Sequence, residues 1–123
     1  MYSMSIVVGN LGGDPEMKYL QEGTPVTNFS IAEDRSYSKD GEKVEKVQWW
    51  KVVAWRKLAE VANQYLVKGR QVLVEGTVTS EAWTSNGEAK SNLVITAKTI
   101  KFLGKRGDVV AEYNAPKEEE LPF

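Results

Sequence analysis

Aromatic and basic side chains alternate along the segment from Val47 to Trp55. A β-strand places every second residue on one face, so Trp49, Lys51 and Trp55 are predicted to share a face. Indole rings offer flat surfaces on which nucleobases can stack, and a cation between them can meet the phosphate that joins two bases. Tryptophans that pack in a core or at a protein interface would give the same pattern, which is the alternative interpretation.

Two further aromatic residues fall in or beside predicted loops. Tyr37 lies in the polar segment 35–46, and Trp83 leads into a hairpin whose tip is Asn86-Gly87, a dipeptide typical of two-residue turns. A polar hairpin tip has little core to reach, so Trp83 is a candidate ligand contact. The alternatives are a solvated Tyr37 and a Trp83 that packs against its own hairpin.

Basic residues are interleaved with these aromatic residues. Their side chains could follow a phosphate backbone, although a single surface charge is more often simply solvated. Acids such as Asp40, Glu81 and Glu88 occupy the same regions, which argues against a uniformly basic groove. The basic set is Lys18, Arg35, Lys51, Arg56, Lys57, Lys68, Arg70 and Lys90.

The end of the chain combines three acids, Glu118, Glu119 and Glu120, with the apolar tip Leu121, Pro122 and Phe123. Such a tip can fill a small apolar pocket while its acids and its terminal carboxylate meet basic residues on a partner. A solubilising acidic tail is the alternative.

The composition is that of one soluble domain with an uneven charge distribution. The 123 residues are 41% hydrophobic and 27% charged, with a net charge of −1. Residues 1–106 carry 15 Lys or Arg against 12 Asp or Glu, a balance of +3, whereas residues 107–123 carry one Lys against five acids, a balance of −4. The overall isoelectric point of about 5.6 therefore hides a mildly basic body.

The chain contains no cysteine and no histidine. Disulfides, thiolate nucleophiles, Cys/His zinc sites and Ser-His-Asp triads are therefore excluded. The carboxylate pairs Asp14/Glu16 and Glu33/Asp34 carry no further sign of catalysis, so we expect no catalytic residues, no metal, no cofactor and no enzymatic activity. No apolar run approaches the roughly 18 residues of a membrane span, and no signal peptide is recognised.

Alternating hydrophobicity predicts five strands, and a single segment has helical spacing. Lys57 to Lys68 is predicted as a helix that buries a stripe and ends near a left-handed Gly69. Arg35 to Lys46 is predicted as a loop with a turn at Asp40-Gly41, Thr84 to Lys90 as a turn, and Gly104 to Phe123 as disordered. The predicted strands are Met4 to Gly9, Val26 to Asp34, Val47 to Trp55, Gln71 to Trp83 and Ser91 to Leu103, with Tyr19-Leu20 as an extension of the sheet.

Five strands with one helix between the third and the fourth fit an OB-fold barrel, which often binds oligonucleotides or oligosaccharides. We therefore predict an all-β fold with one helix over residues 1–104, followed by a short flexible tail over residues 105–123 that ends in the acidic tip.

Several segments resemble bacterial single-stranded DNA-binding proteins (SSB). The likeness runs from about Ile6 to Leu103 and returns at Glu118 to Phe123; together the segments are highly specific, although each alone is weak. They are Ile6 to Glu16 (IVVGNLGGDPE), Trp49 to Trp55, Lys57 to Ala62, Tyr65 to Gly69, Val74-Glu75-Gly76, Trp83-Thr84 and Leu121-Pro122-Phe123.

The resemblance implies an OB-fold homotetramer that wraps single-stranded DNA without sequence preference, in the cytoplasm and at the nucleoid. It implies no enzymatic activity, and it implies a tip that recruits replication, repair and recombination proteins. By position, bases would stack on Tyr37, Trp49, Trp55 and Trp83. Phosphates would meet Lys51, Lys57 and Lys68, with Lys18 and Arg35 placed less securely.

The sequence also departs from the family's pattern. Trp50 occupies a position that is often His near a subunit contact, which makes it a candidate interface residue. Thr79 to Ala82 replace residues that are commonly basic, which predicts weaker phosphate contact there. Tyr37 replaces a frequent Trp, and the linker Lys105 to Lys117 is short, which restricts the reach of the tip.

Three rival functions remain open on the sequence alone. An OB-fold RNA binder would favour RNA through its 2′-hydroxyl groups. An interaction adaptor would bury the tryptophan cluster in a protein interface and would not bind nucleic acid. A carboxylate-based nuclease would cleave DNA with a metal ion, and it is the least favoured of the three.

Overall fold

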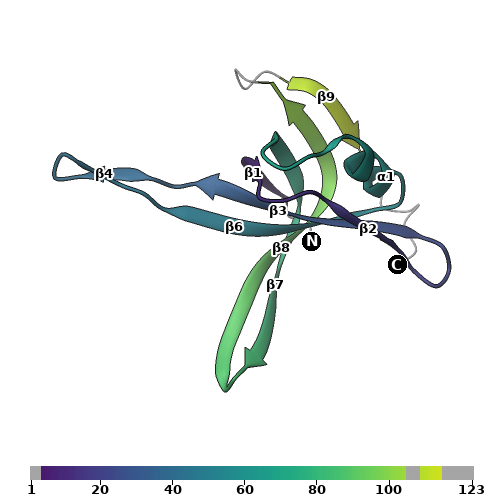
Figure 1. Cartoon of the computed structure of the whole chain (residues 1–123), viewed down its shortest axis with the longest axis horizontal. Coiled ribbons are helices and arrows are strands. Elements are labelled where there is room, and N and C mark those ends of the chain that lie inside the picture. The colour runs from purple at the N-terminus through teal and green to yellow at the C-terminus, as the bar shows by residue number, and fades with distance from the viewer. Residues whose placement is uncertain (1–3, 105–108, 115–123) are drawn as a thin grey trace.

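The computed structural model describes residues 4–104 and 109–114. Its secondary structure consists of short and long strands with one helix (Figure 1). The elements are β1 (Ser5–Leu11), β2 (Glu16–Tyr19), β3 (Pro25–Asp34), β4 (Tyr37–Lys39), β5 (Glu42–Val44), β6 (Val47–Trp55), α1 (Arg56–Tyr65), β7 (Gln71–Ser85), β8 (Glu88–Leu103) and β9 (Val109–Asn114).

Five of the strands close into a barrel. β1 pairs with β7 and, at its end, with β3; β3 pairs with β6, and β6 runs parallel to β8, which returns to β7. β2 extends the sheet from β3, and β9 extends it from β8. The predicted five-stranded barrel with one helix is confirmed.

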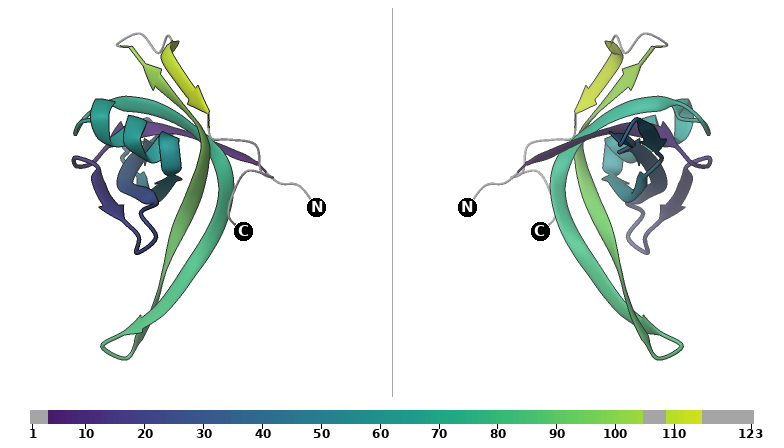
Figure 2. Two further views of the ribbon diagram at one scale, coloured as in Figure 1. Left: turned by 90° about the vertical axis from the view of Figure 1, so that its right-hand side faces the viewer. Right: turned by 90° about the vertical axis from the view of Figure 1, so that its left-hand side faces the viewer.

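Two hairpins leave the barrel in different directions (Figures 1 and 2). The β4–β5 hairpin continues β3 and β6 outward, and β7 and β8 project as a long arm that we call the β7–β8 arm (residues 78–94). The turn at the tip of the β7–β8 arm is Asn86-Gly87, with φ values of 53° and 80°, as predicted. The strands reach this tip, so the predicted turn at 84–90 is too wide.

The segment Arg35 to Lys46 is not only a loop, because it contains β4 and β5. The predicted turn at Asp40-Gly41 is present, with φ values of 51° and 78°. Pairs such as Tyr37 with Val44 join the two short strands.

The helix is shorter than predicted at its C-terminal end. The periodicity predicts a buried stripe of Leu58, Val61, Ala62, Tyr65 and Leu66. Four of these residues are buried, whereas Tyr65 is 48% exposed. The chain leaves the helix after Tyr65 because tertiary hydrogen bonds hold the next segment. The Lys68 N–H donates to Asp14 Oδ1 (2.9 Å), and the Gly69 N–H donates to the Leu11 carbonyl oxygen (2.8 Å). Gly69 has the predicted positive φ, but in this connection rather than at the helix end.

The prediction of disorder for Gly104 to Phe123 is wrong for residues 109–114, which form β9. Ala111 and Tyr113 alternate toward the core, and Tyr113 stacks on Tyr65 of α1 with a centroid separation of 6.1 Å. Edge pairing with β8 and this aromatic contact supply the stability that the short alternating segment lacks alone. Residues 115–123 lie outside the described residues.

The core lies between the barrel wall and α1. Ile31, Val52, Val72 and Ile95 are fully buried in it. A buried Thr27 donates its hydroxyl to the Ala59 carbonyl oxygen (2.7 Å), which ties β3 to α1 and satisfies a polar group in the core.

Candidate nucleic-acid interface

The two faces of β6 have the predicted alternation. Trp50, Val52 and Ala54 are buried in the core. On the opposite face Trp49 is 55% exposed, and Lys51 and Trp55 are partly exposed. The strand therefore presents two indole rings and an ammonium group on the outside of the barrel.

Cross-strand register gathers further side chains on this outer face. Trp49 pairs with Ala32 and Lys51 pairs with Ser30 across β3 and β6. At the other end of β6, Trp55 and Lys18 are both register partners of Val26. Directly paired residues project to the same face, so Lys18, Lys51 and both tryptophans share it.

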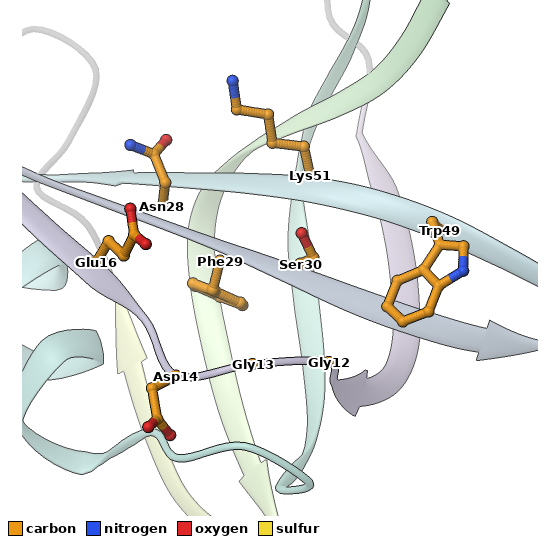
Figure 3. A pocket seen from close by; sticks show the side chains of 9 residues that line it. All are labelled: Gly12, Gly13, Asp14, Glu16, Asn28, Phe29, Ser30, Trp49 and Lys51. Atoms are coloured by element: carbon orange, nitrogen blue, oxygen red, sulfur yellow. The ribbon is translucent and has the colours of Figure 1, made fainter.

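A groove of about 510 Å³ lies on this face (Figure 3). Trp49 and Lys51 border it from β6, and Asn28, Phe29 and Ser30 line it from β3. This volume can hold a planar ring stacked on the Trp49 indole or inserted edge-on beside it. The lining residues are Gly12, Gly13, Asp14, Glu16, Asn28, Phe29, Ser30, Trp49 and Lys51.

The sequence predicts only Trp49 and Lys51 of this lining as ligand contacts. The other seven lining residues are Gly12, Gly13, Asp14, Glu16, Asn28, Phe29 and Ser30. Asn28 and Ser30 alternate with buried Thr27, Phe29 and Ile31. This alternation of polar and buried residues in the sequence is the signal that places Asn28 and Ser30 on the outer face. Gly12, Asp14 and Glu16 reach the groove through the closure of the barrel, which leaves no local pattern.

Trp50, the candidate subunit contact, is 8% exposed and packs in the core of its own chain. Its Nε1 donates to Glu33 Oε1 (3.0 Å), which satisfies the indole N–H. A role for Trp50 between subunits stays a prediction.

The candidate phosphate contact Arg35 is already paired within the chain. Its Nε donates to the same Glu33 oxygen (2.9 Å), so Glu33 holds both Arg35 and Trp50. This carboxylate thus links the core face of β6 to the base of the β4–β5 hairpin.

Tyr37 begins β4 and is 50% exposed, away from the groove-lining set. Hydrogen bonds fix the chain just before it: the Ser36 N–H donates to Asp34 Oδ1 (2.8 Å), and the Arg35 N–H donates to the Lys46 carbonyl oxygen (2.8 Å). The pKa of Asp34 is lowered, first by the hydrogen bonds from Ser36, which stabilise its charged form, and then by the nearby Lys43.

Two other candidate cations also have acidic neighbours. Lys51 Nζ lies 3.8 Å from Glu81 Oε2 on the β7–β8 arm, and Lys57 Nζ lies 3.8 Å from Glu60 Oε2 one helical turn away. Both pairs are well exposed, so each contributes little to stability and leaves its lysine available to a competing anion.

The remaining candidates are spread around the groove. Lys18 lies exposed on β2, and Lys68 is exposed in the connection whose backbone bonds to Asp14 at the groove edge. The backbone of Trp83 lies on β7, opposite Lys90 on β8. The side chain of Trp83 and the tip Glu118 to Phe123 fall outside what the structure describes.

Two kinds of feature are absent from residues 4–104 and 109–114. These residues contain no group of three or more acidic side chains placed to hold a metal ion. Within the same ranges, no helix has the length and apolarity to cross a membrane.

Residues 3–103 match the family model described as "Single-strand binding protein family". The chain belongs to this family. The resemblance drawn from the sequence is thereby confirmed.

Relatives and solved structures agree with this assignment. "Single-stranded DNA-binding protein 1" of Xylella fastidiosa (strain 9a5c) is 40% identical over 119 residues, covering 94% of this chain and 88% of that protein. The "Single-stranded DNA-binding protein" of Neisseria meningitidis serogroup B (strain ATCC BAA-335 / MC58) is 38% identical over 116 residues, covering 93% of this chain and 66% of that protein.

Two solved structures share the fold. "Plasmodium falciparum SSB complex with ssDNA" superposes with a TM-score of 0.69 and 26% identity over 79% of this chain and 87% of that one. The small single-stranded DNA-binding protein from Streptomyces coelicolor gives a TM-score of 0.66 over 92% of this chain and 94% of that one; at 24% identity it speaks for the fold alone. The OB-fold is confirmed.

Proposed function

We propose that this chain binds single-stranded DNA without sequence preference. The observation that carries the proposal is the outer face of β6, where an exposed Trp49 and Lys51 border one groove in a member of the single-strand binding protein family. Every base has a flat π face, so stacking on an indole tolerates any sequence. A lysine beside the ring adds an equally unselective contact to phosphate.

In this proposal the stacking residues are Tyr37, Trp49, Trp55 and Trp83. Trp49 and Trp55 lie at opposite ends of the same strand face, and Tyr37 lies on the hairpin that continues β3 and β6. DNA would follow this face, with its phosphates near Lys18, Arg35, Lys51, Lys57 and Lys68.

The acids near these cations should make the electrostatic part of binding modest. Glu33, Glu60 and Glu81 each pair with one candidate phosphate contact, and Asp14 and Glu16 border the groove itself. We expect stacking to supply more of the affinity than phosphate contacts do, with a log–log salt slope of about −0.7 for each phosphate neutralised.

The test is a titration of the full chain with oligo-dT while its tryptophan fluorescence is recorded at low and high salt, alongside matched duplex DNA and oligo-U. Strong quenching by oligo-dT, weakened by salt and absent with duplex, is the expected result. Tighter binding of oligo-U would favour the RNA binder instead. Absence of quenching with every nucleic acid would favour the interaction adaptor, and metal-dependent cleavage of the oligonucleotide would favour the nuclease.

We also propose that copies of this chain associate, as a homotetramer. β1 pairs with β7 along one edge, and on its other edge only Asn10 and Leu11 pair with β3. Among the described residues, no strand therefore covers the second edge of Ser5–Gly9. Ile6 on this strand is 61% exposed and Val8 is 39% exposed. An uncovered strand with apolar side chains is suited to pairing with another strand. Analytical ultracentrifugation of wild type and Ile6→Glu tests this, because a wild-type monomer would overturn it.

Partner recruitment through the tip 118–123, in replication, repair and recombination, is likewise a proposal. It rests on the three acids and the apolar end of the sequence, which suit a small apolar pocket with a basic rim. Deletion of residues 121–123 should remove partner binding and leave oligo-dT affinity unchanged. A loss of DNA affinity would contradict this separation of roles. Residues 109–114 of the predicted tail form β9, which pairs with β8.

A further inference from the structure

The ring of Trp49 reaches from β6 across β3 to the loop that follows β1 (Figure 3). Its far end meets the backbone at Gly12. A Cβ atom at Gly12 would lie 2.5 Å from Cζ3 and 2.8 Å from Cη2 of the indole. Carbon atoms in favourable contact are about 3.5–4.0 Å apart, so a side chain at position 12 and the present ring position exclude each other.

The backbone at Gly12 is held more firmly than the ring. The Gly12 N–H donates to the Ser30 carbonyl oxygen (3.0 Å), and the preceding Leu11 is buried, with its N–H bonded to the Arg70 carbonyl oxygen (2.9 Å). Trp49 is 55% exposed, so its ring has open space to move into. A methyl group at position 12 would therefore displace the ring rather than the chain.

We propose that Gly12 is a positioning residue for the Trp49 ring. Its lack of a side chain lets the indole lie against the backbone at the edge of the groove, which fixes one face of the ring for a stacking base. This inference rests on the proposed binding of single-stranded DNA, and it names the residue that sets the orientation of one stacking surface.

The chain supplies a matched control one residue later. Gly13 also lines the groove, but a Cβ atom there would meet nothing within 4 Å. Neither glycine has a positive φ, so alanine fits the backbone at both positions. Gly12→Ala and Gly13→Ala thus add the same methyl group to the same loop, and only the first contacts Trp49.

The first measurement needs no DNA. In a ¹H–¹⁵N spectrum of the full chain, the indole N–H signal of Trp49 is assigned by its loss in Trp49→Phe. Gly12→Ala is expected to shift this signal while Gly13→Ala leaves it in place. An unmoved signal in Gly12→Ala would overturn the positioning role, whatever the chain binds.

The second measurement is the affinity for oligo-dT of wild type, the two alanine variants, Trp49→Ala, and the double variant of Gly12 and Trp49. One stacked base corresponds to about a 5-fold to 150-fold change in affinity, so Gly12→Ala should lose at least several-fold. Gly13→Ala adds the same methyl group to the groove lining without meeting Trp49, so its loss should be clearly smaller than that of Gly12→Ala. In the Trp49→Ala background, Gly12→Ala should add less than about twofold.

Equal losses from Gly12→Ala with and without Trp49 would overturn the proposal, because the methyl group would then act through the loop. A melting temperature of Gly12→Ala well below that of Gly13→Ala would also overturn the proposal, because the methyl group would then disturb the fold. If Gly12→Ala shifts the Trp49 signal but the wild-type chain has no affinity for oligo-dT, the positioning role stands and the proposed DNA binding is rejected instead.

Discussion

Trp49 and Trp50 are neighbours in sequence, and they lie in opposite environments. Trp50 is 8% exposed, packs in the core and donates its indole N–H to Glu33, whereas Trp49 is 55% exposed and borders a groove with its ring against Gly12. One strand thus uses the same residue type in two roles, to hold the barrel together and to present a flat surface. Two substitutions and one charge change test this division.

The largest effect is expected for Trp50→Ala. Replacing a buried aromatic side chain by alanine typically costs about 3–5 kcal/mol in unfolding free energy, and Glu33 would also lose a hydrogen-bond donor. Urea denaturation measures this loss. Trp49→Ala is the matched control and should change stability by less than about 1 kcal/mol. Similar losses for both variants would remove the distinction between the two faces.

Trp49→Ala should instead weaken oligo-dT binding while the chain stays folded. A stacked base contributes roughly 1–3 kcal/mol in proteins of this class, and only Trp49 of the pair offers an open ring. Affinity measured by fluorescence anisotropy of labelled oligo-dT gives the change. The comparison variant is Trp50→Phe, which keeps an aromatic ring in the core. Unchanged affinity of Trp49→Ala would show that its exposure serves another purpose.

The smallest effect is expected for Glu81→Gln, and it has the opposite sign. The Glu81 carboxylate lies 3.8 Å from Lys51 Nζ in an exposed pair and would compete with a phosphate for that ammonium group. Its removal should raise oligo-dT affinity by a few-fold at low salt, and the gain should shrink as salt rises. Glu88→Gln removes the same charge at the tip of the β7–β8 arm. An equal gain in Glu88→Gln would point to overall charge rather than to the ion pair with Lys51.

Much of the barrel could be predicted because its strands alternate in sequence. The burial of Trp50, Val52 and Ala54 with exposure of Trp49 follows from period two alone, and the bounds Val47–Trp55 agree with the prediction. The Asn86-Gly87 turn could also be predicted from its two residues alone. A two-residue hairpin turn needs positive φ at both positions, which Asn and Gly adopt readily.

The errors lie where distant contacts decide the local structure. β9 escaped prediction because six residues form a strand only when β8 supplies hydrogen bonds and Tyr65 supplies an aromatic surface. The helix stops at Tyr65 because Asp14 in the loop after β1 accepts the Lys68 N–H and Leu11 at the end of β1 accepts the Gly69 N–H. The hairpin β4–β5 sits in a stretch too polar to predict as strand.

The sequence by itself determined that Trp49, Lys51 and Trp55 share one side of β6 and that Trp50 lies on the other, because side-chain direction in a strand depends only on position along the chain. It could not determine what stands opposite that face. Gly12 contacts Trp49, and Glu81 forms an ion pair with Lys51. Lys18 and Trp55 flank the same residue of β3. Strand pairing and barrel closure alone bring these residues together. Those contacts join residues far apart in the chain, and such proximity is a property of the closed fold alone.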